Sequence, residues 1–401
     1  MEEKFSKINI QSVLVIIVTL IFITTPFSVI ASKPPTSHIS PFRHFIGSND
    51  EGSHERNDSY HQEWWYFIAF FNKNDSELKN WSMMVSFNQM GVIDILFCAI
   101  FEESDNRSYG GTLTEWKGAL TASKSKLDVT FFNSTLKGKY PKWDIYAEYI
   151  KSNEVTVTVN VTYKANALPL WLFLNLGYNH SKSPFGHYCI INSDVNGSVK
   201  INETTYKIHG VGYHEHSWVS VKQHNQTNLL SLSQKNNRKS DIPAWQLLFD
   251  TWDWVSIFLD NGWNVFAAKI CQRSPISRII PGSLWVTPDG ENITECRYFK
   301  FEYLETKKTT IPTIEIPTKI HMRAVFFKVF LRNPFEGFVR LNMIIQVENL
   351  GEFTWPGSDV SIGVWECPCK VYGTLKWGLN SVELNGCAMM EMTRAAVLNK
   401  I

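Results

Sequence analysis

Two short strings in the chain concentrate ionisable side chains among aromatic rings. The first is His61-Gln62-Glu63-Trp64-Trp65-Tyr66, and the second is Gly212-Tyr213-His214-Glu215-His216-Ser217-Trp218. A polar group among apolar rings costs free energy unless it is hydrogen-bonded. Such strings therefore indicate either a satisfied structural network or a pocket with chemical use.

The second string predicts a strand whose two faces differ. Side chains alternate along a strand, which puts His214, His216 and Trp218 on one face and Tyr213, Glu215 and Ser217 on the other. The first face would place an acid beside an indole. Protonating an alkene gives a carbocation, and a desolvated indole face stabilises a cation by about 2 kcal/mol. These residue types suit hydration of a double bond, and they suit other chemistry too.

Two other interpretations of the histidines stay open. His214 and His216 could form hydrogen bonds that hold a β-barrel closed. They could also bind a metal, because they face one way and His61, His187 or Glu63 could add a ligand. No HExxH or comparable signature supports a metal, so the sequence predicts neither a metal nor any other cofactor.

Glu63 also has two interpretations. It could be a pocket carboxylate whose pKa is raised by the surrounding rings. It could instead be a buried acceptor for backbone or indole N–H groups that closes a barrel corner, and we favour this role slightly. Glu63 would then position the site and leave the chemistry to other residues.

The N-terminal residues have the composition of an export signal. Lys4 and Lys7 precede an uncharged apolar stretch from Val13 to Ala31. We expect residues 1–31 to be a signal peptide cleaved after Ala31 or a single membrane anchor, with a polar linker over residues 32–59. Most of the chain would then be extracytoplasmic, secreted or anchored. Sequons for a glycoprotein agree with export, at Asn57, Asn74, Asn80, Asn106, Asn133, Asn160, Asn179, Asn196, Asn202, Asn225 and Asn292.

Composition excludes several function classes. The 401 residues carry a formal net charge of +1, which gives no basic footprint for nucleic acid. Glycine-rich phosphate loops, Gly-x-Ser-x-Gly elbows and dinucleotide fingerprints are missing from the sequence. Seven cysteines leave at least one unpaired in an oxidising compartment, and Cys271 with Cys296 is the first candidate for a disulfide.

Hydrophobic periodicity predicts an all-β protein. Segments of β-branched and aromatic residues, often alternating with polar ones, are separated by turn signals such as Asp260-Asn261-Gly262, Pro288-Asp289-Gly290 and Ser193 to Gly197. The polar stretch from Gln223 to Asp241 predicts a division near residue 240, with domains over 60–240 and 241–401. The clearest predicted strands are 82–88, 155–163, 254–259, 264–270 and 339–347.

Together these motifs resemble the carotenoid 1,2-hydratase (hydroxyneurosporene synthase) and AttH-like family. The resemblance rests on Glu63-Trp64-Trp65-Tyr66, on the Gly-Tyr-His-acid-His-x-Trp string, and on Asp253-Trp254 leading into Leu259-Asp260-Asn261-Gly262. Pro288-Asp289-Gly290 and Val382 to Gly386 are similar to later landmarks of the family. It implies two lipocalin-like antiparallel β-barrels packed together after an N-terminal hydrophobic helix. Members include hydratases, fungal cyclisation catalysts and secreted proteins of unknown activity.

The resemblance also implies site residues. In the hydratases a His-x-Trp pair of this string and a downstream Tyr and Asp take part in the chemistry. The pair corresponds to His216 and Trp218, but no Tyr stands two residues before Asp250, Asp253 or Asp260. We take Asp253 as the predicted proton donor. The predicted supporting residues are Glu63, Trp64, Trp65, Tyr66, Tyr213, His214, Glu215, Trp252 and Trp254.

Two functions follow from these expectations. One is an exported protein that binds a lipophilic, isoprenoid- or polyketide-like small molecule and catalyses a cofactor-free hydration, isomerisation or cyclisation. The other is a lipocalin-type carrier that leaves such a ligand unchanged. The expected partners are the lipophilic molecule and a membrane if the leader is retained, with no nucleic acid; the sequence predicts no oligomeric state.

Overall fold

The structure of the protein is a computed structural model. It describes residues 46–56, 59–103, 107–152, 154–171, 185–222, 251–271, 282–291, 293–296, 299–309, 315–328, 337–355 and 360–397. The predicted leader and the predicted boundary near residue 240 lie outside these residues, so both stay predictions. In the described ranges, no helix is long and apolar enough to cross a membrane.

The first half of the described chain is a short helix, α2 (Ser48–Glu51), followed by twelve strands that belong to one antiparallel sheet. The strands are β1 (Ser59–Phe70), β2 (Trp81–Met90), β3 (Ile93–Glu102), β4 (Arg107–Trp116), β5 (Leu120–Ala122), β6 (Leu127–Phe131), β7 (Ser134–Lys139), β8 (Lys142–Lys151), β9 (Glu154–Ala165), β10 (Leu170–Trp171), β11 (Phe185–Ile201) and β12 (Thr204–Lys222).

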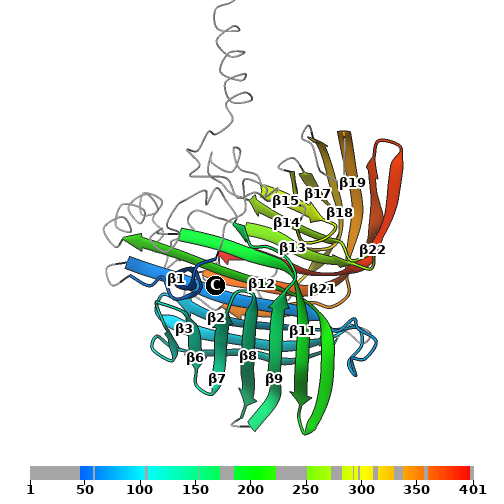
Figure 1. Cartoon of the computed structure of the whole chain (residues 1–401). Coiled ribbons are helices and arrows are strands. Elements are labelled where there is room, and N and C mark those ends of the chain that lie inside the picture. Colours follow the sequence, from blue (N-terminus) through cyan, green and yellow to red (C-terminus); the bar gives the residue numbers. More distant parts are fainter. Residues whose placement is uncertain are drawn as a thin grey trace, which may run out of the picture. The chain divides into compact units, whose positions relative to one another are not determined.

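The second half forms a separate antiparallel sheet of ten strands. They are β13 (Thr251–Leu259), β14 (Asn264–Cys271), β15 (Gly282–Thr287), β16 (Thr294–Cys296), β17 (Phe299–Lys308), β18 (Glu315–Lys328), β19 (Gly337–Val347), β20 (Gly351–Trp355), β21 (Val360–Trp377) and β22 (Asn380–Val397). Figure 1 shows the two sheets in sequence colours.

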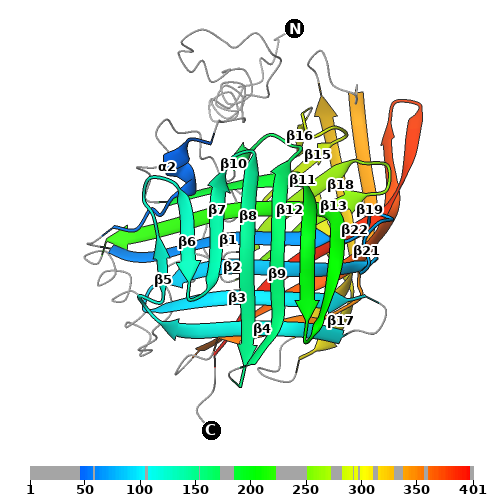
Figure 2. The same ribbon diagram turned by 60° about the horizontal axis from the view of Figure 1, so that its bottom comes forward.

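Each sheet curls over its own apolar side. In the first sheet the strand order is β4-β3-β2-β1-β12-β11-β9-β8-β7-β6-β5, and β8 and β9 cross β3 and β4 closely enough to contact them (Figure 2). In the second the order is β16-β15-β14-β13-β22-β21-β19-β18-β17. The predicted fold class, two lipocalin-like antiparallel β domains, is confirmed.

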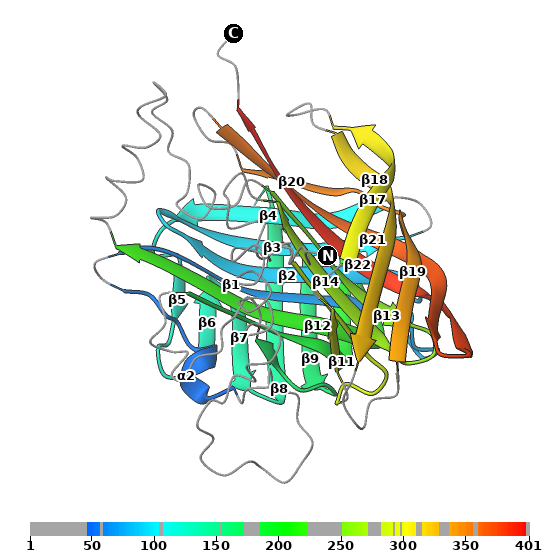
Figure 3. The ribbon, with the colours of Figure 1, turned by 90° about the horizontal axis from the view of Figure 1, so that it is seen from above.

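The two sheets meet along β11 and β12 on one side and β13 and β14 on the other (Figure 3). Residues 40–401 form one compact unit. The larger apolar core lies inside the first sheet and continues into the second through Trp254, Phe258, Phe266 and Met389. A second core lies inside the second sheet. The meeting face is therefore itself apolar and rich in rings.

Most of the predicted strands and turns agree with the structure. The segments 82–88, 155–163, 254–259, 264–270 and 339–347 lie within β2, β9, β13, β14 and β19. The Asp260-Asn261-Gly262 turn joins β13 to β14, with Gly262 N donating to Leu259 O at 2.9 Å. The turn predicted over Ser193 to Gly197 is wrong, because those residues continue β11.

Gly197 explains that error. Its φ is +155°, and a Cβ at this position would lie 2.1 Å from the carbonyl oxygen of Asn160 on the neighbouring strand β9. The glycine thus allows a close approach of two strands, whereas the sequence signal of Asn followed by Gly suggested a turn.

The described cysteine side chains are mostly buried thiols. Cys98, Cys189, Cys367 and Cys369 are free and buried. The Cys271 side chain lies outside the described residues, so its pairing with Cys296 stays a prediction.

Candidate functional site

Strands β1 and β12 form the backbone of the candidate site. They pair antiparallel, with His61 opposite Ser220, Glu63 opposite Trp218 and Trp65 opposite His216. Residues opposite one another share a face, and the contacts below show that the predicted alternation along residues 213–218 is correct. One face carries a buried network of histidines, and the other carries a group of carboxyls.

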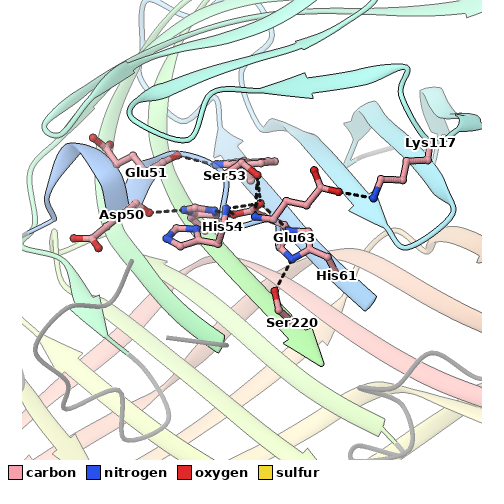
Figure 4. A network of polar contacts seen from close by, with 11 residues as sticks. Asp50, Glu51, Ser53, His54, His61, Glu63, Lys117 and Ser220 are labelled. Atoms are coloured by element: carbon pink, nitrogen blue, oxygen red, sulfur yellow. Dashed lines mark hydrogen bonds and ion pairs between the residues drawn. The ribbon is translucent and has the colours of Figure 1, made fainter. Parts of the chain in front are cut away.

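Glu63 accepts five hydrogen bonds inside the first sheet. Its Oε1 receives the backbone N–H of His54 at 3.0 Å, His54 Nδ1 at 2.9 Å and His216 Nε2 at 2.9 Å. Its Oε2 receives Ser53 Oγ at 2.9 Å and His61 Nε2 at 2.9 Å. We call these five residues the Glu63 centre (Figure 4). The side chain of Glu63 has no exposed surface, so these donors replace all of its water.

The partners of His216 determine where its protons lie. Nδ1 is 2.9 Å from the backbone carbonyl oxygen of Asp50, which can only accept, so Nδ1 carries a proton. Nε2 is 2.9 Å from Glu63 Oε1, and two unprotonated atoms would repel at this distance. When Nε2 also carries a proton, that proton lies between His216 and Glu63 and belongs to the pair as a whole.

Burial and hydrogen bonding act in opposite directions on this pair. Burial opposes ionisation of Glu63, yet the hydrogen bonds from His216, His54 and His61 hold its pKa well below the usual range. Burial lowers the pKa of His216 to about 4, although the hydrogen bond and the charge of the Glu63 carboxylate act in the opposite direction. Aromatic rings enclose the pair, since His54 stacks on Trp218 at 3.6 Å and Trp65 on His216 at 4.9 Å between ring centroids.

The residues that hold the Glu63 centre include part of the predicted linker. Ser53 and His54 are buried and donate hydrogen bonds to Glu63, and the backbone carbonyl of Asp50 accepts one from His216. Glu51 accepts from Trp143 Nε1 at 2.7 Å and from the backbone N–H of Tyr140 at 3.0 Å. We name residues 46–56 the strap. The sequence predicted a polar linker here, because the strap has a polar composition. Its side chains are buried by strands that come later in the chain.

The strap contains an acid that should make stability depend on pH. Burial raises the pKa of Glu51 from 4.5 to about 7. Below pH 4.5 the folded and unfolded states both hold the proton; above it only the folded state does, so stability falls until about pH 7. Glu51→Gln should remove this loss and raise the free energy of unfolding at pH 8 by about 3 kcal/mol.

Urea unfolding of both proteins between pH 4 and pH 8 measures this effect. Glu55→Gln in the same strap is the control, because Glu55 makes a part-exposed ion pair with Lys117 and such pairs contribute little. If the free energy of unfolding depended on pH in the same way for wild type and Glu51→Gln, Glu51 would not be the buried protonated acid that we infer.

The other face of β1 and β12 meets three carboxyls. Tyr66 OH donates to Glu366 Oε2 at 2.8 Å, across the two sheets. Trp64 Nε1 donates to Glu215 Oε1 at 2.9 Å, and Tyr213 OH donates to Glu215 Oε2. Glu391 on β22 lies directly opposite Glu366 on β21 and accepts from Trp252 Nε1. We call Glu215, Glu366 and Glu391 the carboxyl centre.

Two members of the carboxyl centre hold protons near neutral pH. Burial, together with the charge of Glu391, raises the pKa of Glu366 well above its usual value. Burial and the charge of Glu215 raise the pKa of Glu391 to about 7. Burial also opposes ionisation of Glu215. His187, at 3.3 Å, and the hydrogen bonds that Tyr213 and Trp64 donate to Glu215 nevertheless lower its pKa. At pH 7 the centre thus combines the Glu215 carboxylate with a protonated Glu366 and a Glu391 that is about half protonated.

Aromatic rings surround these acids. Trp254 lies opposite Glu391 in the strand register and contacts Tyr66 at 5.4 Å and Tyr213 at 5.3 Å between centroids. Trp64, Trp252 and Glu391 are partly exposed, whereas His216 and Glu63 are fully buried. Of the two centres, only the carboxyl centre has a member that solvent or a ligand can contact while it holds a proton.

The structure brings most of the predicted site residues together, in two groups. His214, His216, Trp218, Glu63 and Trp65 lie on the inner face, and Trp64, Tyr66, Tyr213, Glu215, Trp252 and Trp254 lie around the carboxyl centre. His214 is buried with its Nδ1 against Tyr66 O at 3.1 Å, and burial lowers its pKa to about 3.

Asp253 does not join either group. It lies beside Val255 of the second core, forms an ion pair with Arg394 at 2.6 Å and accepts from Tyr303 OH. Alternation along β13 places it on the face opposite to that of Trp252 and Trp254. The role of Asp253 as proton donor stays a prediction, and its position beside Arg394 and Tyr303 does not support it.

Sequence reasoning missed Glu366 and Glu391. Each of these acids stands alone between apolar residues in the sequence, and this pattern could have identified them. The strings are Trp365-Glu366-Cys367 and Met390-Glu391-Met392. An acid at such a position needs a partner or a proton. That the two acids face each other depends on the pairing of β21 with β22, which their local sequence does not reveal.

A cation could in principle use three of the inner residues. His54, Glu63 and His216 offer ligand atoms within 4.8 Å of one another. In this arrangement the imidazole nitrogens that face Glu63 share protons with its carboxylate, so a metal would have to displace those protons. The absence of a metal remains a prediction.

The fold and the two centres define a protein with tandem lipocalin-like β domains and a buried acid group where the domains meet. No protein-family model matches the chain, and no curated protein sequence matches it. Among solved structures, it is similar to a putative AttH from Nitrosomonas europaea, with TM-score 0.58, 12% identity, and 89% of this chain and 99% of that chain covered.

Two further solved structures share the fold. Kievitone hydratase from Nectria haematococca has TM-score 0.53 and 12% identity over 88% of this chain and 98% of that chain. CghA, solved with Sch210972, has TM-score 0.52 and 10% identity over 84% of this chain and 88% of that chain. At these identities the similarity establishes the AttH-like, lipocalin-type fold alone, and carotenoid hydration in particular is not shown.

Proposed function

We propose that the protein binds a lipophilic small molecule, isoprenoid- or polyketide-like, against the rings around the carboxyl centre, and that it transfers a proton to this ligand without a cofactor. The observation that supports this most strongly is the Glu366–Glu391 pair. Two carboxyls sit directly opposite each other, hold protons near neutral pH and are bordered by Trp252, Trp254 and Tyr66.

The chemistry follows from these groups. Glu391, the partly exposed member, gives its proton to a carbon or oxygen atom of the ligand and becomes a carboxylate. Positive charge then develops on the ligand, and the faces of Trp252 and Trp254 together with the Glu215 carboxylate stabilise it. Addition of water, loss of another proton, or ring closure followed by proton loss gives a hydration, an isomerisation or a cyclisation. The proton released in each case returns to the Glu391 carboxylate.

The Glu63 centre has a different part in this proposal. His216 and Glu63 are fully buried, and their hydrogen bonds join β1, β12 and the strap. Because Trp64 and Tyr66 flank Trp65 on β1, and Glu215 precedes His216 on β12, these bonds position residues of the carboxyl centre on the opposite face. His216 is therefore a positioning residue here, and Trp218 packs on His54.

The related structures are consistent with a small-molecule role. One of the proteins of this fold is named a hydratase, and another was solved with Sch210972. These names describe those proteins, and they support the general class of our proposal. The substrate of this chain follows only from its own rings and acids.

The test is to identify what the protein carries. Full-length wild type, Trp254→Ala and the control Trp116→Ala, which alters a tryptophan that is 77% exposed, are purified and extracted with organic solvent. Mass spectrometry should find a lipophilic compound in wild type and Trp116→Ala and much less in Trp254→Ala. The extracted compound is then added to fresh wild type and to Glu391→Gln, and the products are compared.

Three outcomes separate the alternatives. Conversion by wild type and not by Glu391→Gln would support proton transfer. A bound compound that wild type leaves unchanged would indicate the carrier. A wild-type extract without any lipophilic compound, or equal amounts in Trp254→Ala, would contradict the proposed binding site.

A further inference from the structure

The inner face of β1 and β12 contains a serine, a histidine and a carboxylate in series. Ser220 Oγ lies 2.8 Å from His61 Nδ1, and His61 Nε2 lies 2.9 Å from Glu63 Oε2 (Figure 4). His61 and Ser220 are directly opposite each other in the strand register. The proton-transfer function proposed above does not use this series.

The protonation of the series can be read from its partners. We treat Glu63 as a carboxylate, because Ser53 Oγ and the backbone N–H of His54 donate to it and three imidazole nitrogens lie 2.9 Å from its oxygens. It accepts a proton-bearing His61 Nε2, which leaves the lone pair of Nδ1 free to accept the Ser220 hydroxyl. A neutral imidazole thus lies between an oriented acid and a serine hydroxyl, which is the relation that activates a serine nucleophile.

The series lies near the end of its strands. Two residue pairs further along, Ser59 opposite Lys222 is the last described pair of the β1–β12 ladder. The backbone carbonyl of His61 accepts from Gly91 N at 3.0 Å in the turn before β3, where Val92 is 66% exposed. Ser220 itself is 7% exposed, against none for the side chain of His216. Ser220 is therefore less completely enclosed than His216.

The geometry points to a second activity at this place: Ser220, His61 and Glu63 form a triad that transfers acyl groups, with carboxylic esters as the class of substrate. The Ser220 oxygen attacks the ester carbonyl carbon while its proton passes to His61 Nδ1. The resulting imidazolium is held by the Glu63 carboxylate and returns the proton to the departing alcohol.

A water molecule completes the reaction. It attacks the acyl-serine, gives one proton to His61 and releases the carboxylic acid as Ser220 regains its proton. The balance is one ester and one water consumed, with one acid and one alcohol formed. The order of ring atoms distinguishes this triad, because Nδ1 faces the nucleophile and Nε2 faces the acid.

Ser53 provides a matched control. It also donates to Glu63, at 2.9 Å, and it is equally buried at 7% exposure. Its oxygen is within hydrogen-bonding distance of the carboxylate and of the Glu55 backbone N–H, so it receives no activation from an imidazole. A reagent that selects activated serines should distinguish Ser220 from Ser53.

The experiment treats the full-length protein with an alkyl fluorophosphonate and locates the label by peptide mass spectrometry, while p-nitrophenyl butyrate measures ester hydrolysis. We expect one label on Ser220 and none on Ser53, with the Ser220 label absent in Ser220→Ala and His61→Gln and retained in Ser82→Ala, which alters a buried serine of β2 outside the Glu63 centre. Hydrolysis should fall to background in the first two variants only.

Near-ultraviolet circular dichroism checks that each variant is folded, and Ser220→Cys gives a second test because a thiol at this site should react with iodoacetamide faster than Cys98. No label on folded wild type, a label on another serine, or hydrolysis unchanged in Ser220→Ala would overturn the proposal. Glu391→Gln should leave the labelling intact, so failure here and failure of the proton-transfer function are separate results.

Discussion

Glu63→Gln is expected to lower the free energy of unfolding by about 3–5 kcal/mol, because it removes one partner of a buried charged network. The amide keeps the shape of the side chain but offers one acceptor oxygen in place of two. His216 then loses the carboxylate that lies 2.9 Å from its Nε2, while its Nδ1 still donates to Asp50 O at 2.9 Å. Urea unfolding followed by tryptophan fluorescence measures the loss.

Ser53→Ala is the control for this variant. It removes one of the donors to Glu63 and leaves the carboxylate with the three histidines. A single hydrogen bond contributes about 1 kcal/mol, so Ser53→Ala should be several-fold less damaging. A loss below 1 kcal/mol for Glu63→Gln would mean that the Glu63 centre does not hold the strap and strands together.

Glu391→Gln is expected to have the largest effect on chemistry. A positioned general acid contributes about 10²–10⁴-fold to a rate, and the amide cannot give up a proton. The variant should fold normally, because the side chain it replaces is uncharged below about pH 7. The readout is deuterium uptake or water addition by isoprenoid alkenes incubated in heavy water and analysed by mass spectrometry.

The pH dependence of this reaction has a definite sign. Glu391 must hold its proton to act as the acid, so the wild-type rate should fall as pH rises above about 7. Glu383→Gln changes an exposed carboxylate on the same strand and should react like wild type. A Glu391→Gln protein with the wild-type rate would remove Glu391 from the mechanism.

The sequence predicted features that depend on local periodicity. Alternation between residues 213 and 218 correctly separated His214, His216 and Trp218 from Tyr213 and Glu215, because strand geometry requires nothing beyond nearest neighbours. The same rule applied to residues 252–254 would have shown that Asp253 faces away from Trp252 and Trp254. Its position between two tryptophans suggested a shared environment that the strand does not allow.

The remaining site residues depend on contacts between distant segments. Ser53 and His54 lie in a polar stretch, and their burial follows from strands β1 and β12, the second of which ends at Lys222. Glu366 and Glu391 become a pair only through the register of β21 with β22. Pairing registers of long strands are set by the packing of whole sheets, and a short motif does not contain that information.

The proposed chemistry requires Glu366 and Glu391 to hold protons near neutral pH. Infrared spectroscopy measures this directly, because the carbonyl stretch of a carboxylic acid is separate from the bands of a carboxylate. In a Glu51→Gln background, which removes the remaining carboxyl among the described residues whose pKa is raised, we predict a carboxylic-acid band at pH 7 that weakens in Glu366→Gln and in Glu391→Gln. A spectrum without that band, or a band that neither substitution changes, would contradict the account.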